Sequence, residues 1–349
     1  MSQGIDLVRE AGLQDERGSG NAGQACTSRQ LITTVTLRST EDLREATQGA
    51  DLRVIQLAPG PFGGLLTRAQ IGTMSVSAGD FEPGIRARGV MNPDLVTIGM
   101  IVESTGNVMQ WDYDVLPGDI VVIPKSVEQE GRFTGRSQFL TLTLSQQDLA
   151  AYGAGEGALE DPEFWNKAAR FRPSSSVRAF IRRELSAKIA QLRSGAVPNS
   201  AVALDYFKRS LVEAFIVGVL DHQDAGTRKR EGSRGSLVVR AVEDYVDAVK
   251  NDQPLHISEL CLATRVTRRA LHRAFHETLG IGPIEYLRLR RLSSVHGALS
   301  RSYPAPMSIT RLALDAGFSD LGRFSAYYRK IYGETPSQTQ RRSMAQAVA

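Results

Sequence analysis

Cysteine is scarce in this chain of 349 residues, which contains only Cys26 and Cys261. Two isolated cysteines supply neither a disulfide framework nor the four thiolates of a structural zinc site, and they indicate a reducing compartment. Long apolar runs are also absent, because no stretch reaches the roughly 18 residues of a membrane-spanning helix. Residues 1–20 have no continuous apolar core, so we expect no secretory signal. These absences predict a cytoplasmic protein without membrane association.

Histidine is rare as well, and its distribution limits the chemistry of the N-terminal half. All five histidines follow residue 220: His222, His256, His272, His276 and His296. A histidine-based metal site is therefore excluded from residues 31–150, because imidazole is the usual ligand of protein-bound zinc, copper and iron. No Gly-rich phosphate loop or serine-nucleophile motif stands out either. A carboxylate-only metal site formed by Glu82, Asp112 or Asp114 is the remaining alternative, but the sequence favours solvated loop acids there. We expect no metal, no cofactor and no enzymatic activity.

Charge is unevenly distributed along the chain. The net charge of +4 combines −4 in residues 1–221, +2 in residues 222–236 and +6 in residues 237–349. A basic domain beside a mildly acidic one is the electrostatic pattern of a protein that binds duplex DNA. Residues 222–236 lack large apolar side chains and are rich in Gly, Ser and charge, which predicts a flexible linker.

Residues 31–150 carry the pattern of a β domain, after a polar N-terminus (1–30) that we expect to be disordered. From about residue 51 to residue 145, short β-branched segments alternate with turns rich in Gly, Pro and Asn. This pattern predicts an all-β barrel or sandwich that forms a pocket for a small molecule. The candidate pocket residues combine aromatic or apolar surface with positive charge: Phe81, Arg86, Arg88, Met100, Trp111 and Tyr113. Core packing and charge at the rim are the alternative roles of these residues.

Residues 151–221 return to helical spacing and form a predicted connector. Amphipathic helices are expected at 177–192 and 204–220. The second is apolar around much of its circumference, which predicts that it is buried. Two locations remain open for its large apolar side chains, the β domain or the partner subunit of a homodimer. These side chains are Phe207, Leu211 and Phe215.

The C-terminal part contains two similar passages, 258–280 and 308–333. Each begins at a serine, runs through a short apolar helix, breaks, and restarts at a hydroxyl residue, Thr267 or Ser319. Such hydroxyls cap helices by accepting a hydrogen bond from a free amide. Two short helices joined by a tight turn are the plan of the helix-turn-helix. The pattern predicts an all-α domain at 237–342 with two such units, followed by a frayed tail at 343–349.

The second helix of the first passage carries a basic face. Its apolar residues recur every three or four positions and predict one buried stripe. The other positions form a polar face: Arg268, Arg269, His272, Arg273 and His276. A helix that reads the major groove needs such a face, because it must neutralise phosphates and offer donors to base edges. A solvated basic face is the alternative for a single helix, whereas two tandem units favour DNA.

Residues that are typical of one family of DNA-binding domains occur in both units and in the segment between them. They are Arg269, Leu271, Arg273, Phe275, Gly280, Pro283, Tyr286, Leu287, Arg291, Leu292, Ile309, Leu312, Ala313, Gly317, Phe318, Ser319, Phe324, Gly333 and Pro336. With them, residues 237–342 resemble the C-terminal DNA-binding domain of the AraC/XylS transcription regulators. The chain departs from that family at Cys261, where alanine is usual, at Arg265, where glycine is usual, and at Ala326, where arginine is frequent.

The resemblance implies that both second helices enter successive major-groove faces of double-stranded promoter DNA. In the first unit it places Arg269, His272 and Arg273 toward the bases. In and beside the second helix, the implied DNA-contacting residues are Ser319, Leu321, Gly322, Arg323, Ser325, Ala326 and Arg329. Because few of these are polar readers, we expect the first unit to supply most base readout and the second to rely on phosphates and DNA shape. The family also implies a homodimer and contact with RNA polymerase.

Residues 115–126 resemble a strand–turn–strand passage of the cupin barrel, the sensory domain of many AraC/XylS regulators. The barrel and the reading helix are also faintly similar to regulators of amine or ethanolamine use. The predicted architecture is a multidomain α+β protein with a cupin-like barrel, a helical connector and an all-α domain. The predicted function is effector-responsive activation of transcription. The alternatives are a cupin-type enzyme fused to a DNA-binding module and an architectural DNA binder without an effector.

Overall fold

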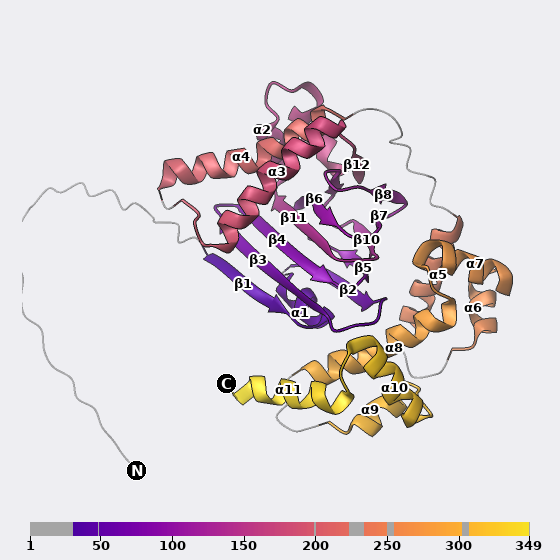
Figure 1. The fold of residues 1–349 in the computed structure, drawn as a ribbon. Helices are drawn as coiled ribbons and strands as arrows, with labels where there is room; N and C mark the ends of the chain where they lie inside the picture. The colour runs from indigo at the N-terminus through magenta and orange to yellow at the C-terminus, as the bar shows by residue number, and fades with distance from the viewer. Residues whose placement is uncertain are drawn as a thin grey trace, which may run out of the picture.

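The structure is a computed structural model that describes residues 31–47, 49–198, 200–222, 234–249, 255–301 and 307–348. N-terminal sheets, a pair of long helices and a C-terminal helical part follow one another along the chain (Figure 1). This order confirms the predicted α+β organisation into a β-rich and a helical part. The predicted disordered segment 1–30 lies outside the described residues, as does most of the predicted linker.

Two antiparallel sheets form the N-terminal part. Tight turns connect several strands, such as the one at Gly72, whose φ of 61° suits glycine. The strand order in the larger sheet is β1 (Leu31–Leu37), β3 (Gly63–Ile71), β4 (Met74–Glu82), β11 (Ser137–Leu144), β6 (Val96–Ser104), β9 (Ile120–Ile123) and β12 (Ala169–Phe171). In the smaller sheet the order is β2 (Asp51–Gln56), β5 (Ile85–Val90), β10 (Glu128–Phe133), β7 (Val108–Gln110) and β8 (Tyr113–Val115).

Two strands lie outside the predicted strand segments of about 51–145, although β1 is within the predicted β domain at 31–150. β1 precedes residue 51, and β12 falls in the segment predicted to be helical. β1 lies at the sheet edge with mostly exposed side chains, so it lacks the apolar alternation of a half-buried strand. β12 has three residues and pairs with β9, which is too short a segment to show a period.

A helical layer packs on one face of the larger sheet. α3 (Ser175–Arg193) and α4 (Ala201–Leu220) lie across it, beside α2 (Gln146–Tyr152) (Figure 1). Their apolar side chains and those of the strands form one core. Within it, Phe207, Leu211 and Phe215 are at most 2% exposed. These three side chains therefore pack inside their own chain, in the core shared with the β domain, and not against a partner subunit.

The described C-terminal residues are mainly helical and contain the two predicted helix-turn-helix units. The helices are α5 (Arg234–Ala248), α6 (Ile257–Thr264), α7 (Arg268–Leu279), α8 (Pro283–Ser300), α9 (Ile309–Asp315), α10 (Leu321–Tyr332) and α11 (Pro336–Val348). The pairs α6–α7 and α9–α10 are the two units, and α8 connects them (Figure 1).

Several predicted helix ends differ from the structure. α5 begins inside the predicted linker, and α11 continues through the predicted frayed tail to Val348. His256 caps α6 in place of the predicted Ser258, within a reciprocal capping box. Asp320 caps α10 in place of the predicted Ser319, accepting a hydrogen bond from the amide of Arg323 at 2.9 Å. The positive end of the helix dipole favours a carboxylate there.

Candidate DNA-binding surface and ligand cavity

The first reading helix, α7, presents its predicted basic face to solvent. Thr267 caps the helix by accepting a hydrogen bond from the amide of Ala270 at 3.2 Å. The buried stripe consists of Leu271, Ala274, Phe275 and Leu279. The opposite face has four exposed side chains and the half-buried His272; the exposed ones are Arg268, Arg269, Arg273 and His276. The helix therefore leaves its charged groups free for phosphates and base edges.

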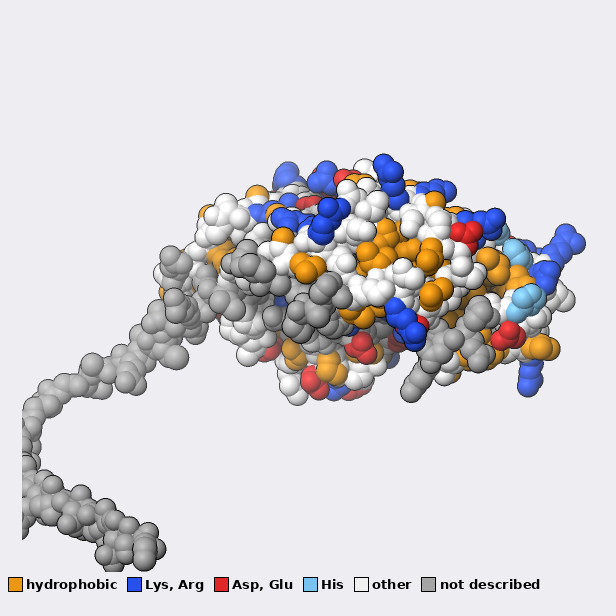
Figure 2. All heavy atoms as spheres, turned by 90° about the horizontal axis from the view of Figure 1, so that it is seen from below, with side chains coloured by type: hydrophobic (Ala, Val, Ile, Leu, Met, Phe, Trp, Pro, Cys, Tyr) orange, Lys and Arg blue, Asp and Glu red, His pale blue; other side chains and the backbone are white. Residues whose placement is uncertain are grey.

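The second reading helix, α10, repeats this division. Its buried side chains are Phe324, Tyr328, Ile331 and Tyr332. The predicted contact residues are all exposed: Ser319, Leu321, Gly322, Arg323, Ser325, Ala326 and Arg329. One end of the molecule shows His side chains next to Lys and Arg side chains (Figure 2). Both units thus offer accessible basic groups.

The connecting helix α8 ties the second unit to the first. Its buried apolar side chains belong to a core that also contains residues of both reading helices. Arg291 of α8 donates from Nη1 to the carbonyl oxygen of Gly317 at 3.0 Å. The same guanidinium lies 5.0 Å from the ring centroid of Phe318. α8 therefore holds the turn between α9 and α10 directly.

The turns of the two units differ in one backbone position. Arg265 has a φ of 53°, in the left-handed region, where the second unit has Gly317 with a φ of 78°. We expect Arg265→Gly to raise the unfolding free energy by about 0.5–1 kcal/mol, because a Cβ is disfavoured in this conformation. Urea unfolding of the full-length protein checks this. Gly317→Ala is the matched reverse change and should be destabilising, and a loss of stability in Arg265→Gly would contradict the prediction.

An ion cluster that is buried except for Asp244 joins the sheets to the C-terminal helices. It consists of Arg86 and Arg88 on β5, Glu130 on β10, and Glu243 and Asp244 on α5. Arg86 Nη2 lies 2.9 Å from Glu130 and 3.0 Å from Glu243. Arg86 and Arg88, which were predicted to line the effector pocket, instead face α5. The alternation of strand side chains explains this, because their neighbours Ile85 and Ala87 point the other way, into the cavity described below.

The cluster keeps its central acid ionised. Burial by itself raises the pKa of the Glu243 carboxyl, but Arg86, Tyr286 and Arg88 lower that pKa below the ordinary value. The Tyr286 hydroxyl donates to Glu243 at 2.7 Å. The opposite effect holds for Arg86, where the carboxylates of Glu243 and Glu130 outweigh burial and raise the pKa. The ionised forms of Glu243 and Arg86 are therefore favoured, although their side chains are only 2% and 5% exposed.

Further polar contacts extend this interface. Buried His296 on α8 lies 2.9 Å from Glu41 on α1 (Thr40–Ala46) and stacks on Tyr332, with ring centroids 4.1 Å apart. Asp247 on α5 pairs with Arg53 on β2 and with Arg290 on α8. These partners are far apart in sequence, so local patterns gave no sign of them.

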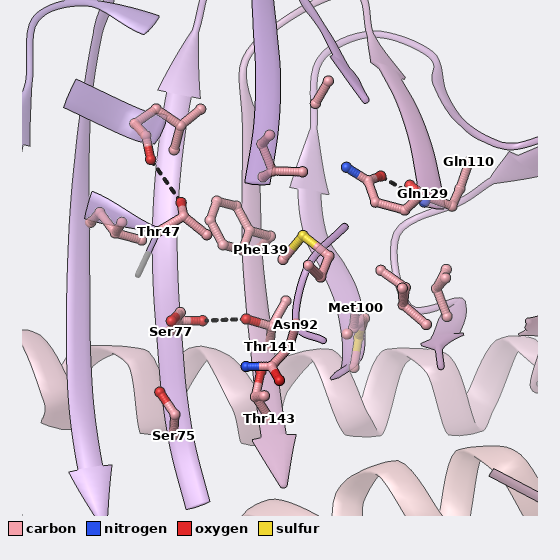
Figure 3. Close-up of a pocket in the computed structure, with 18 of the residues that line it drawn as sticks. Thr47, Ser75, Ser77, Asn92, Met100, Gln110, Gln129, Phe139, Thr141 and Thr143 are labelled. Carbon is pink, nitrogen blue, oxygen red and sulfur yellow. Dashed lines mark hydrogen bonds between the residues drawn. The ribbon is translucent and has the colours of Figure 1, made fainter. Parts of the chain in front are cut away.

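A cavity of about 450 Å³ lies between the two sheets (Figure 3). Of the predicted pocket residues, Phe81 and Met100 line it, whereas Trp111 and Tyr113 are not among its described lining residues. β4 and β11 direct a row of hydroxyls into the cavity: Ser75, Ser77, Thr141 and Thr143 (Figure 3). The smaller sheet contributes mainly apolar side chains, namely Leu52, Val54, Ile85, Ala87, Val108 and Val115. The cavity is therefore amphipathic.

Arg68 is the charged side chain among the described residues that line this cavity. Its Nη1 donates to the carbonyl oxygen of Ala46 at 2.9 Å, and its Nε has no hydrogen-bond partner among the described residues. No described carboxylate lies within ion-pair distance of it. Burial lowers the pKa of Arg68, because it disfavours the charged guanidinium. A bound anion would relieve that cost.

Among the described residues, no helix has the length and apolar character needed to cross a membrane. No group of three or more His, Cys, Asp or Glu side chains in that part of the chain is placed to hold a metal ion.

Comparison with known proteins identifies relatives of the C-terminal part. Residues 260–342 match the family model described as a helix-turn-helix domain. XylDLEGF operon transcriptional activator 2 of Pseudomonas putida is 35% identical over 102 residues, 29% of this chain and 62% of that protein. The probable thc operon regulatory protein of Rhodococcus erythropolis is 32% identical over 101 residues, 29% of this chain and 30% of that protein. The chain thus spans less than two thirds of either relative.

Two solved structures are also similar to this chain. A probable AraC family transcriptional regulator from Rhodopseudomonas palustris is 36% identical, with 31% of this chain and 97% of that chain covered and a TM-score of 0.29. The AraC-like transcriptional activator CuxR is 16% identical, with 74% and 94% covered and a TM-score of 0.40.

Proposed function

The chain belongs, through its tandem helix-turn-helix region, to the AraC/XylS family of transcription regulators, and from this premise we propose that it activates transcription by binding promoter DNA with α7 and α10. The observation that carries the proposal is the pair of capped reading helices whose basic faces are both exposed on one α8-linked core. Selection of genomic fragments by the purified full-length protein tests it. Enrichment of one motif with two contacted segments about one helical turn apart is the expected result.

Arg273 is the side chain for which we expect the clearest base contact. It is 71% exposed and lies 3.8 Å from Glu277, a surface pair too weak to hold it away from DNA. We expect Arg273→Ala to weaken binding to the selected site by about 1–3 kcal/mol and to relax the preference at one base position. Titration against a set of single-base variants measures both effects. Equal weakening on all of them would identify Arg273 as a phosphate contact instead.

In our proposal, residues 31–150, which form both sheets except for β12, are a cupin-like effector domain, and the cavity between the sheets binds an amphipathic molecule with an anionic or hydrogen-bond-accepting head. Arg68 and the row of hydroxyls suit such a head, and the apolar walls suit its hydrocarbon body. An amine, suggested by the fainter sequence similarity, finds no carboxylate among the described lining residues.

Thermal unfolding with a matched ligand series tests this class. In 3-phenylpropanoate, 3-phenylpropanol and 3-phenylpropylamine the body is constant and the head changes. We expect the acid to raise the melting temperature most, because ligand bound to the folded state stabilises it by mass action. Arg68→Gln should remove the advantage of the acid over the alcohol. A larger effect of the amine would contradict the proposed class.

We also place a homodimer and contact with RNA polymerase in the proposed function, with residues 151–221 as connector and dimerisation segment. Because Phe207, Leu211 and Phe215 are buried in their own chain, a dimer through α4 has to use its exposed side, where Val202 and Tyr206 are 82% and 73% exposed. Sedimentation velocity of the wild type and of Tyr206→Asp is the direct measurement of this dimer.

A further inference from the structure

Both reading helices end against the N-terminal sheets, and we propose that these contacts set the spacing of the two DNA segments that the chain reads. At the end of α7, Arg132 of β10 donates from Nη1 to the carbonyl oxygen of Thr278 at 2.9 Å. At the end of α10, the carbonyl oxygen of Ile331 accepts hydrogen bonds from Gln56 Nε2 at 2.7 Å and from the amide of Gly60 at 3.0 Å. We call these the helix-end contacts. The inference rests on the proposed DNA-binding function.

The chemistry of a helix end favours these donors. The last four carbonyls of an α-helix have no partner within the helix, and they carry the negative end of its dipole. A guanidinium that donates to such a carbonyl oxygen supplies the missing hydrogen bond and places positive charge at the negative end of the dipole. A side-chain amide supplies the missing hydrogen bond. Gln56 is 2% exposed, and its Nε2 also lies 2.9 Å and 2.7 Å from the carbonyl oxygens of Ala58 and Gly60, so its amide is fixed in place. No described carboxylate lies within ion-pair distance of Arg132.

The glycines that end the two reading helices pack closely against the N-terminal part of the chain. Gly280 and Gly333 end the reading helices with φ angles of 74° and 72°. A Cβ on Gly280 would lie 2.6 Å from Arg132 Nη2, and one on Gly333 would lie 3.2 Å from Cδ of Pro61. A side chain at Gly280 would therefore crowd the Arg132 guanidinium, and one at Gly333 would crowd Pro61, between β2 and β3.

The helix-end contacts leave the reading faces open. Arg273 on α7 and Arg323 on α10 are 71% and 78% exposed while the contacts are formed. The sheets therefore do not cover these two reading side chains. They add a second bridge between the two units beside α8, because β2 and β10 belong to one sheet through β5. A helix held at both its core face and its end has little freedom to tilt.

DNA geometry makes this restraint a matter of specificity. One added base pair moves the second segment by about 3.4 Å and turns it by about 35° around the axis. Reading helices with a fixed separation reject such a site, whereas helices that tilt independently tolerate it. A ligand in the cavity would contact the two strands that carry the helix-end contacts, because Leu52 and Val54 of β2 and Gln129 of β10 line the cavity. Arg132 and Gln56 are thus positioning residues for DNA reading.

The test uses the full-length protein and the DNA site that it selects, with one or two base pairs inserted or removed between the two segments. For the wild type we expect affinity to fall about tenfold per changed base pair, similar to the loss from a mismatched base pair. For Arg132→Ala combined with Gln56→Ala we expect a fall of about threefold or less, with the unaltered site bound within about fivefold of wild type. Arg132→Lys, which keeps a donor, should recover part of the wild-type discrimination.

Arg136→Ala is the control, because Arg136, in the turn between β10 and β11, is 60% exposed and lies 4.0 Å from Asp80 of β4. It should keep the wild-type spacing preference. If the double variant does not fold, Arg132→Ala alone is compared, since Arg132 is only partly buried. An unchanged spacing preference in a folded variant overturns the inference while leaving DNA binding intact. Failure of the wild type to select any DNA removes the proposed function, and the inference with it.

Discussion

Replacement of Glu243 by alanine is expected to lower the unfolding free energy of the full-length protein by about 3–5 kcal/mol. The Glu243 side chain is 2% exposed and faces Arg86, whose own side chain is 5% exposed. Removal of this carboxylate leaves the buried guanidinium with Glu130 alone and takes the acceptor from the Tyr286 hydroxyl. The cost is the free energy of keeping an incompletely compensated charge out of water. Urea unfolding followed by circular dichroism measures it.

Asp244 offers a matched control for this change. It is the next residue on α5 and pairs with Arg88 at 2.6 Å, but its side chain is 58% exposed. Solvent screens such a pair, so Asp244→Ala should cost no more than about 1 kcal/mol. Equal losses of stability from the two substitutions would contradict the expectation that the buried carboxylate costs more to remove than the exposed one.

The same carboxylate makes stability depend on pH. Because Arg86, Tyr286 and Arg88 outweigh burial and lower the pKa of Glu243, the folded state favours its ionised form. Its contribution is complete above the unfolded-state pKa of about 4.3 and is lost as the pH falls through the lower folded-state value. Glu243→Gln resembles the protonated acid. The unfolding midpoints of this variant and the wild type should therefore differ at pH 7 and converge in acid.

The helix-turn-helix units could be predicted from sequence because their information is local. Capping residues such as Thr267 and a stripe with a period of three to four residues determine α7 without reference to the rest of the chain. The alternating segments likewise predicted strands. Pocket residues were harder, because alternation shows that two neighbours face opposite sides without showing which side is the cavity. Phe81 lines the cavity, whereas Arg86 faces α5.

The interface between the sheets and the helices could not be predicted in this way. Arg86 and Glu243 are 157 residues apart in sequence, and Gln56 and Ile331 are 275 apart. Each of these residues has an ordinary local context. Only the packing of β5 against α5 brings Arg86 to Glu243, and only the packing of the end of β2 against α10 brings Gln56 to Ile331. On β5, Arg86 and Arg88 alternate with Ile85 and Ala87, which is the pattern of a strand with one solvated face, although all four residues are buried.

DNA affinity is expected to fall roughly 10²–10³-fold between about 50 and 200 mM monovalent salt. The proposed reading surface contains five exposed arginines: Arg268, Arg269, Arg273, Arg323 and Arg329. Each phosphate that such a cation neutralises releases condensed counterions, and the logarithm of affinity falls with the logarithm of salt by about 0.9 per phosphate. Fluorescence anisotropy with the selected site, repeated over this salt range, gives the slope.

Single substitutions then assign the slope to residues. Arg329→Ala, in the last turn of α10, should reduce it by about one, since the second unit is the one expected to rely on phosphates. Arg183 on α3 is the control, because it is 75% exposed and far along the chain from both reading helices. Arg183→Ala should leave the slope unchanged. A shallow slope in the wild type would mean that contacts other than phosphate neutralisation provide the affinity, and the exposed basic faces of α7 and α10 would then lose their proposed role.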